Sequence, residues 1–313
     1  MSRIVTLTLN PALDLSTETE KVMPGPKLRC GAPRIDPGGG GVNVSRAISK
    51  LGGESLCAVA AGRSAGATLL RLLKAEGLEA RDLGLDLPTR DSLSVIETST
   101  GAQYRFVMPG PDWQADHIGH AISRIEGWCA NGDFLVSSGS LPPGVPDTVF
   151  SDFNDWMLGR GVKMVLDTSG PALAVAAARR GLYALRMDGA EAEILAGRPL
   201  QDVTASAEFA VRMVAEEVAE VVQIARGAEG TVIAQSSGVW HCAPPKVEMV
   251  SAVGAGDSHV AGFVLGLAQG LDPVSACIQG VAAAASAVTT PDTALCEREA
   301  AAALAKRVVV KRL

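Results

Sequence analysis

The sequence predicts an α/β fold with a mainly parallel central sheet, helices on both of its faces and a small β-sheet lid. The first reason is that strand-like and helical segments alternate along most of the 313 residues, and repeated β–α units build a parallel sheet. The second reason is that this alternation lapses in two places, residues 11–37 and 88–109. We expect these two segments to pair as the lid, inserted into a single domain over residues 1–313.

The composition disfavours several classes of protein. A formal net charge of −6 argues against nucleic acid or an anionic membrane as partner, and no apolar run reaches the ~18 residues of a spanning helix. The six cysteines lack disulfide or metal-site spacing and fit thiols in a reducing compartment. The first residues enter a strand pattern without a signal-peptide layout. We therefore expect a cytoplasmic protein that acts on small molecules.

The first half of the chain contains the predicted lid and the first β–α units. Asn10-Pro11 ends the first strand, and prolines and glycines break up the segment that follows it. The predicted elements are a strand at 3–9, short strands within 13–37, a helix through 47–51, a strand at 55–61, a helix through 69–73, and a hairpin of strands at 92–98 and 103–107.

The second half resumes the alternation. It predicts helices at 121–130, 149–158, 209–218, 260–269, 273–288 and 297–307, and strands at 134–137, 162–166, 182–186, 221–224, 231–234, 239–242 and 245–250. In such a sheet, ligands bind at the carboxyl ends of the strands. The glycine- and acid-bearing segments fall mostly at these ends, which predicts one composite site.

The segment Val253-Gly254-Ala255-Gly256-Asp257 lies where a strand-like stretch meets a helix. Glycines let the backbone approach a ligand closely, and the free N–H groups of the first helical turn attract anionic oxygen. One interpretation of Asp257 is a helix N-terminal charge. The other is a general base aimed at a hydroxyl that attacks a phosphoryl group, with the loop amides holding the developing charge.

A second glycine run, residues 37–43, precedes another helix and ends in Asn43. Such a run is often a flexible linker. Here it is short and lies between a strand-like stretch and a clear helix. These neighbours favour a backbone that passes close to a ligand.

Charged residues elsewhere leave two interpretations open. Glu191, with Asp188, is either a helix N-terminal charge or a group that holds Mg²⁺ through water. The loop from Arg226 to Gly230 is either an ordinary turn or part of a nucleotide pocket. The lid segments also carry a group of basic residues, which are solvated surface individually and a phosphate-binding cluster together: Lys27, Arg29, Arg90 and Arg105.

Taken together, these motifs resemble those of the ribokinase-like, or PfkB, carbohydrate kinases over essentially the whole chain. The glycine signatures are residues 37–43 and 253–257, and further shared stretches are residues 27–30, 104–110 and 138–144. The resemblance implies a ribokinase-like three-layer domain and an ATP- and Mg²⁺-dependent phosphosugar kinase. We expect a 6-phosphofructokinase, with tagatose-6-phosphate or fructose-1-phosphate kinase as alternatives and a weakly catalytic sugar-phosphate or nucleotide sensor as a third.

The resemblance also implies a role for each site residue. Asp257 is the expected base, with Gly254, Ala255 and Gly256 around the transferring phosphoryl group. The expected sugar-side residues are Asp14, Gly39 and Asn43, and the expected phosphate-side residues are Lys27, Arg90, Arg105 and Ser140. The expected nucleotide residues are Asp188, Arg226, Gly227 and Gly230, and the expected magnesium-water residue is Glu191. The lid implies a homodimer.

Several positions depart from the family's pattern. Arg186-Met187-Asp188 stands where relatives carry Lys-Pro-Asn, so Asp188 adds a negative charge near ATP and Mg²⁺. Ala252 and Ala225 replace residues that are commonly Thr or Ser. The segment Thr290-Pro291-Asp292 changes a loop that contributes to monovalent-cation binding in relatives, which puts K⁺ activation in doubt. Because Asp257 and its glycines are intact, we expect the chemistry to be retained.

Overall fold

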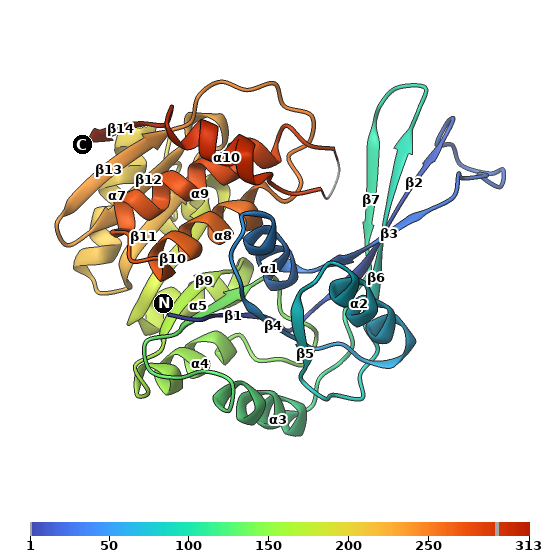
Figure 1. The fold of residues 1–313 in the computed structure, drawn as a ribbon, viewed down its shortest axis with the longest axis horizontal. Coiled ribbons are helices and arrows are strands. Elements are labelled where there is room, and N and C mark those ends of the chain that lie inside the picture. Colours follow the sequence, from blue (N-terminus) through green and yellow to red (C-terminus); the bar gives the residue numbers. More distant parts are fainter. Residues whose placement is uncertain (1, 292–293) are drawn as a thin grey trace.

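The computed structural model describes residues 2–291 and 294–313 and contains two β-sheets. The large sheet has ten strands in the order β14-β13-β12-β11-β10-β9-β8-β1-β4-β5. Neighbours from β5 to β11 are parallel, and β11 to β14 are antiparallel. The predicted parallel α/β sheet is confirmed, and Figure 1 shows the second, smaller sheet projecting from one side of it.

The strands of the large sheet supply the buried centre of the molecule. Their bounds are β1 (Ile4–Thr8), β4 (Leu56–Val59), β5 (Glu79–Asp82), β8 (Phe134–Ser138), β9 (Lys163–Asp167), β10 (Leu182–Asp188), β11 (Ala219–Ala225), β12 (Thr231–Gln235), β13 (Gly238–Ala243) and β14 (Val309–Arg312). Strands β1, β4 and β8 are buried at every residue. This is expected of parallel strands that are covered on both faces.

Helices cover both faces of this sheet. Their bounds are α1 (Gly40–Lys50), α2 (Arg63–Ala75), α3 (Ala115–Glu126), α4 (Val149–Leu158), α5 (Gly170–Arg179), α6 (Gly189–Ala196), α7 (Val203–Ala215), the 3₁₀ turn η1 (Gly227–Glu229), α8 (Ala255–Ala268), α9 (Pro273–Ala287) and α10 (Arg298–Ala305). One core joins the sheet to α3–α7, and the cores on the opposite face join it to α1, α2, α8 and α9. No helix in the part of the chain that the structure describes is both long and apolar enough to cross a membrane.

The small sheet has four strands in the order β3-β2-β6-β7. They are β2 (Ala12–Thr19), β3 (Arg34–Gly38), β6 (Arg90–Glu97) and β7 (Gln103–Val107). Strand β2 pairs in parallel with β6, and the two outer pairs are antiparallel. The two segments that interrupt the β–α alternation therefore do pair with each other, as predicted for the lid.

The two faces of the small sheet differ in chemistry. Residues paired across neighbouring strands lie on the same face. One row runs through Asp36, Asp14, Ser92 and Val107, and the next row on that face contains Arg105. The opposite face carries the apolar row Ile35, Leu15, Leu93 and Phe106. The polar face is therefore the one that carries the predicted substrate residues.

The sequence-based assignment of elements was wrong in several places. Residues 245–250 are not a strand, because Pro244 and Pro245 have no N–H to give to a ladder and Met249 and Val250 lie exposed. Strands β5 and β14 were missed, since both are four residues long and partly or wholly exposed. Helix α5 was missed because it begins with a Gly-Pro pair that resembles a turn. Helices α3 and α7 begin six residues earlier than predicted.

Candidate active site

Helix α8 begins at the catalytic signature with a glycine that the fold requires. Gly254 is the N-cap residue and has a left-handed backbone, with φ +74°. A β-carbon at this position would also lie 2.4 Å from Leu295 Cδ2. The amides of Ala255 and Gly256 follow in the first turn, where backbone N–H groups lack intrahelical partners. The Ala255 amide makes only a long, 3.5 Å hydrogen bond to the Ala252 carbonyl. The predicted helix start is thus present, and its role in binding anionic oxygen stays a prediction.

Asp257 lies in this first turn and is held by the other glycine loop. Asn43 Nδ2 donates to Asp257 Oδ2 over 3.0 Å, which joins residues 214 positions apart in the sequence. Burial, with a contribution from the Asp167 charge, raises the pKa of Asp257 to about 7, whereas the Asn43 hydrogen bond and the Arg186 charge act in the opposite direction. A carboxyl with a pKa near neutral pH is suited to accept a proton.

The glycine run before α1 is packed against other parts of the chain, so the linker interpretation is wrong. Gly39 has φ +114°, and a β-carbon on it would lie 2.7 Å from Thr8 Cγ2. A β-carbon on Gly40 would lie 2.4 Å from Ser138 Oγ, and one on Gly38 would lie 2.1 Å from Asp14 Oδ2. The run lets α1 begin close to β2 and to the end of β8.

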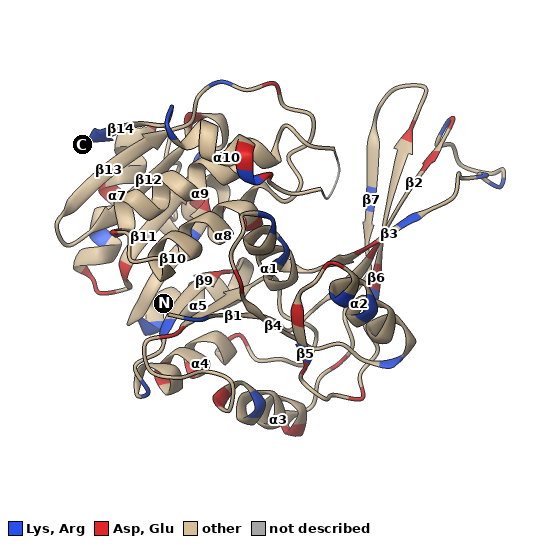
Figure 2. Ribbon diagram, viewed as in Figure 1, with Lys and Arg blue, Asp and Glu red and all other residues tan. Residues whose placement is uncertain are grey.

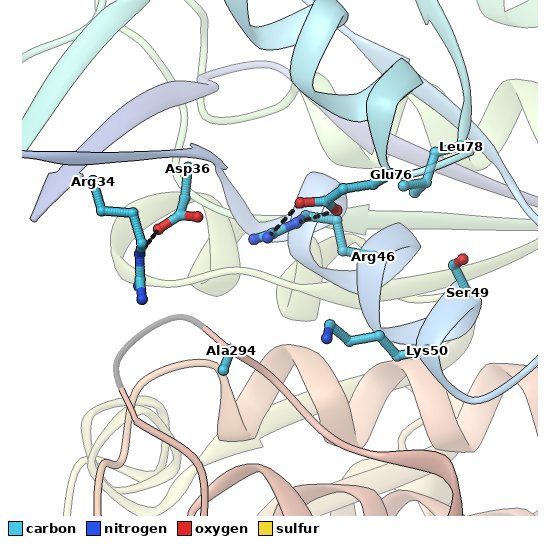
Figure 3. A pocket seen from close by; sticks show the side chains of 8 residues that line it. All are labelled: Arg34, Asp36, Arg46, Ser49, Lys50, Glu76, Leu78 and Ala294. Atoms are coloured by element: carbon cyan, nitrogen blue, oxygen red, sulfur yellow. Dashed lines mark hydrogen bonds and ion pairs between the residues drawn. The ribbon is translucent and has the colours of Figure 1, made fainter.

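Arg46 on α1 anchors the start of the same run, and Figure 3 shows its ion pair with Glu76. Its guanidinium pairs with both carboxylate oxygens of Glu76 over 2.8 Å, and Nη1 donates to the Pro37 carbonyl over 3.2 Å. These contacts form one side of a cavity of about 340 Å³ between β3, α1 and the loop at Ala294. Arg46 therefore fixes the point at which β3 turns into α1.

Sequence reasoning missed an ion pair beside the catalytic loop. Arg186 Nη1 donates to Asp167 Oδ1 over 3.0 Å, and Ser138 Oγ donates to the other oxygen, Oδ2, over 3.1 Å. A β-carbon on Gly256 would lie 3.3 Å from both terminal nitrogens of Arg186. The available signals were an acid at the end of a strand and the departure at residue 186. Neither indicates that the two side chains meet.

The lid places Asp14 and Arg105 near Asp257, and α1 places Asn43 there. A cavity of about 260 Å³ between the polar face of the small sheet and the start of α8 is lined by Asp14, Asn43, Arg105, Gly254 and Asp257, among others. Burial raises the pKa of Asp14, while Arg90 and Arg105 partly offset this rise. Arg90 donates to the carbonyls of Met108 and Asn10 over 3.0 and 3.4 Å.

Ser140 and Lys27 lie outside the lining of this cavity. Ser140 is exposed after β8, and its hydroxyl accepts a hydrogen bond from Asn10 Nδ2 over 3.3 Å. Lys27 and Arg29 lie in the exposed loop between β2 and β3, where Figure 2 shows basic residues at the edge of the molecule. Arg105 thus lines the cavity, and Arg90 lies close enough for its charge to act on Asp14, whereas Lys27 and Ser140 are not among the lining residues.

The predicted nucleotide side lies around β10 and β11. Asp188 is the N-cap of α6 and forms a capping box with Glu191: Glu191 N donates to Asp188 Oδ1, and Asp188 N donates to Glu191 Oε2. The guanidinium of Arg226 donates hydrogen bonds to Glu229, to Ser206 and to two backbone carbonyls of the loop before α7. Gly227 and Gly230 have positive φ angles of +58° and +105°. Arg226 therefore shapes this loop through protein contacts.

Comparison with models of protein families identifies the family of this chain. The model of the pfkB family carbohydrate kinases matches residues 6–300, which include both glycine loops and the lid. The chain belongs to the pfkB family. The ribokinase-like fold and the carbohydrate kinase class follow from this membership.

Individual pfkB relatives cover nearly the whole chain. The ATP-dependent 6-phosphofructokinase isozyme 2 of Mycobacterium tuberculosis is 37% identical over 95% of this chain and 87% of its own. Its namesake from Escherichia coli is 35% identical over 96% of each chain. The crystal structure of Escherichia coli phosphofructokinase-2 in complex with potassium has a TM-score of 0.94 at 34% identity, covering 98% of this chain and 99% of that one. The Escherichia coli 1-phosphofructokinase is also similar, at 29% identity over 98% and 97% of the two chains.

Magnesium binding through Glu191 stays a prediction for this pfkB chain. Among residues 2–291 and 294–313, no three His, Cys, Asp or Glu side chains are grouped closely enough to hold an ion directly. Burial raises the pKa of Glu191 and the charges of Asp188 and Asp167 add to the rise, although its bond from the Asp188 amide and the Arg186 charge oppose it. The prediction places a hydrated ion beside Glu191, since Mg²⁺ keeps much of its hydration shell in protein sites. The departure at Asp292 in the predicted K⁺ loop lies outside the described residues.

Proposed function

We propose that this chain is an ATP-dependent 6-phosphofructokinase that converts fructose 6-phosphate and ATP into fructose 1,6-bisphosphate and ADP. The observation that carries the proposal is a carboxyl of near-neutral pKa, Asp257, at a helix N-terminus that faces a cavity with basic lid residues. The relatives named as 6-phosphofructokinases support this choice of phosphosugar.

In the proposed reaction, Asp257 accepts the proton of the sugar 1-hydroxyl as the oxygen attacks the γ-phosphoryl group. Phosphoryl transfer depends on positioning and on stabilising the charge of the transferred group. The amides of Ala255 and Gly256 would serve the second task from the first turn of α8, where the Ala255 amide makes only a long, 3.5 Å hydrogen bond to the Ala252 carbonyl. Asn43 keeps the Asp257 carboxylate aimed at the cavity through its 3.0 Å hydrogen bond.

The sugar is proposed to bind between the lid and the body. Asp14 and Asn43 would hold sugar hydroxyls beside Gly39, because Asn43 Oδ1 is buried and has no hydrogen-bond partner within the described part of the chain. Arg90 and Arg105 would bind the 6-phosphate, with Ser140 as a further donor. Lys27, in its exposed loop, would contribute only when that loop or a second subunit brings it close.

The nucleotide is proposed to lie over the ends of β10 and β11. Gly227 and Gly230 give its loop the backbone shape that allows close approach, and Arg226 fixes that loop. Glu191, with Asp188, would hold the hydration shell of Mg²⁺. The ion, when bound, neutralises charge on the ATP phosphates.

A homodimer through the lid is part of the proposal. Ile35 and Phe106, in the apolar row on the outer face of the small sheet, are 42% and 48% exposed, and this row would be buried by a second copy. Placement in the cytoplasm is also proposed, because all six cysteines are unpaired.

Initial rates with fructose 6-phosphate, tagatose 6-phosphate and fructose 1-phosphate test the substrate. We expect kcat/KM to be highest for fructose 6-phosphate, and a tenfold preference for another sugar, ~1.4 kcal/mol, would replace our choice. The matched control is Asp257→Asn. A chain that binds ATP and phosphosugar but releases no more ADP than this control would be a sensor instead of an enzyme.

A further inference from the structure

The ion pair between Arg186 and Asp167 connects the two glycine loops of the site. Asp167 ends β9, Arg186 lies near the end of β10, and their side chains are only 13% and 15% exposed. On one side, Ser138 donates to Asp167 and lies against Gly40 in the first loop. On the other side, Arg186 lies against Gly256 in the second loop. The series of contacts Gly40–Ser138–Asp167–Arg186–Gly256 therefore links the two loops.

Both oxygens of Asp167 are used within this chain of contacts. One accepts from Arg186 and the other from Ser138. Arg186 uses only Nη1 in this pair, and its Nε is buried without a hydrogen-bond partner among the described residues. The pair is thus rigid on the acidic side and keeps its cation beside the start of α8.

We propose that Asp167 and Arg186 are a positioning pair that sets the charge environment of the base, Asp257, through two opposed charges of fixed geometry. The proposal rests on the proposed function, since it assumes that Asp257 accepts the sugar proton. Neither residue needs to exchange a proton itself. The pair acts by favouring or disfavouring the ionised Asp257 carboxylate.

The electrostatics of Asp257 agree with this geometry. The Asp167 charge raises the pKa of Asp257 and the Arg186 charge lowers it. Asp14 from β2 adds a smaller rise, and Asn43 from α1 lowers the pKa by donating to the carboxylate. Arg105 from β7 lines the cavity that Asp257 faces. Glu191 from α6 acts indirectly, because its negative charge interacts with the positive charge of Arg186. Removing one charge of the pair should therefore leave the effect of the other charge on the pKa of Asp257 unopposed.

Opposite shifts of the pH profile test the proposal. The ionised base is present above its pKa, so kcat/KM for fructose 6-phosphate should fall as pH decreases through about 7. Asp167→Asn removes a negative charge and should move this acid limb about 1 pH unit lower. Arg186→Met removes a positive charge and should move it about 1 pH unit higher. The double variant should return the limb to near its original position.

Arg186→Lys is the conservative control, because it retains the charge and should retain the position of the limb. Thermal unfolding of each variant separates folding defects from the position of the limb. Limbs that move in the same direction, or that stay in place while the rate falls, overturn the proposal. Absence of ADP release from the unsubstituted protein would instead refute the proposed function.

Discussion

The two sheets of this molecule differ in burial and in what they bring to the site. In the large sheet, β1 and β8 are buried at every residue, whereas β7 in the small sheet is exposed at every residue. The large sheet holds Asp167 and Arg186 on β9 and β10, and helix α8, which packs against this sheet, holds Asp257. The small sheet supplies Asp14, Arg90 and Arg105. The rigid part therefore holds the groups proposed for phosphoryl transfer, and the exposed part holds those proposed for sugar-phosphate binding.

This division suits the physical demands of each task. A base and its charge partners need fixed distances, which a close-packed body provides. Binding a substrate from water requires a surface that solvent can reach, and elements of low local stability are usual for this purpose. Substitutions in the two regions should therefore affect different quantities.

The largest effect is expected at the base. Asp257→Asn keeps the size of the side chain but removes the proton acceptor, so kcat should fall about 10²–10⁴-fold. The dissociation constant for fructose 6-phosphate, measured by calorimetry, should change by a few-fold at most. A kcat within tenfold of the unsubstituted enzyme would remove Asp257 from the mechanism.

The next effect concerns stability. Phe153 lies in the core under the large sheet and is 1% exposed, so Phe153→Ala should lower the free energy of unfolding by about 3–5 kcal/mol. The matched lid variant, Phe106→Ala, removes a side chain that is 48% exposed and should cost less than about 1 kcal/mol at protein concentrations where the chain is monomeric. Urea unfolding of both variants measures the difference. Equal losses would mean that the lid is part of the stable core.

Arg90→Ala should affect substrate binding more than turnover. Loss of a charged hydrogen bond to phosphate should raise KM for fructose 6-phosphate about 10–100-fold, with kcat changed much less. Arg81→Ala is the control, because Arg81 pairs with Glu79 on the surface and should leave both constants unchanged. A fall in kcat with an unchanged KM would place Arg90 with the catalytic groups instead.

The smallest effect on a single chain is expected from a charge on the outer lid face. Phe106→Asp should leave the fold of the monomer intact but shift the mass measured by light scattering from dimer to monomer. The proposed dimer buries the apolar row, and an unpaired buried carboxylate is unfavourable. An unchanged mass would move the proposed interface to another surface or show that the unsubstituted chain is already monomeric.

The sequence was sufficient to predict the architecture and the edge of the sheet at which the candidate site lies. Periodicity identified most of the strands, and interruptions of that periodicity located the lid. Helix-start chemistry correctly placed Asp257 in the first turn of α8. These features depend on local spacing, which a sequence displays directly.

The remaining features depend on which strand ends are neighbours. The pairing of Asp167 with Arg186 follows from the adjacent, parallel strands β9 and β10, in which these two residues are directly paired. No local sequence pattern shows which residues of β9 and β10 are paired. The contacts of Arg226 with the loop before α7 and the distance of Lys27 from the cavity likewise come from tertiary packing.

The register of the small sheet has a mechanical consequence. Its base is a line through Gly38, Ala12 and Arg90, which are paired across β3, β2 and β6 at the points where the chain passes between the two sheets. Arg105 pairs with Ser94, four residues further along β6, or roughly 13 Å from that line. Rotation of the sheet about its base would act as a lever, so Arg90 would stay nearly in place while Arg105 would sweep through an arc. Such a rotation would change the distance of Arg105 from Asp257, with which it lines the cavity in this structure, while Arg90 kept its place beside the base of the sheet.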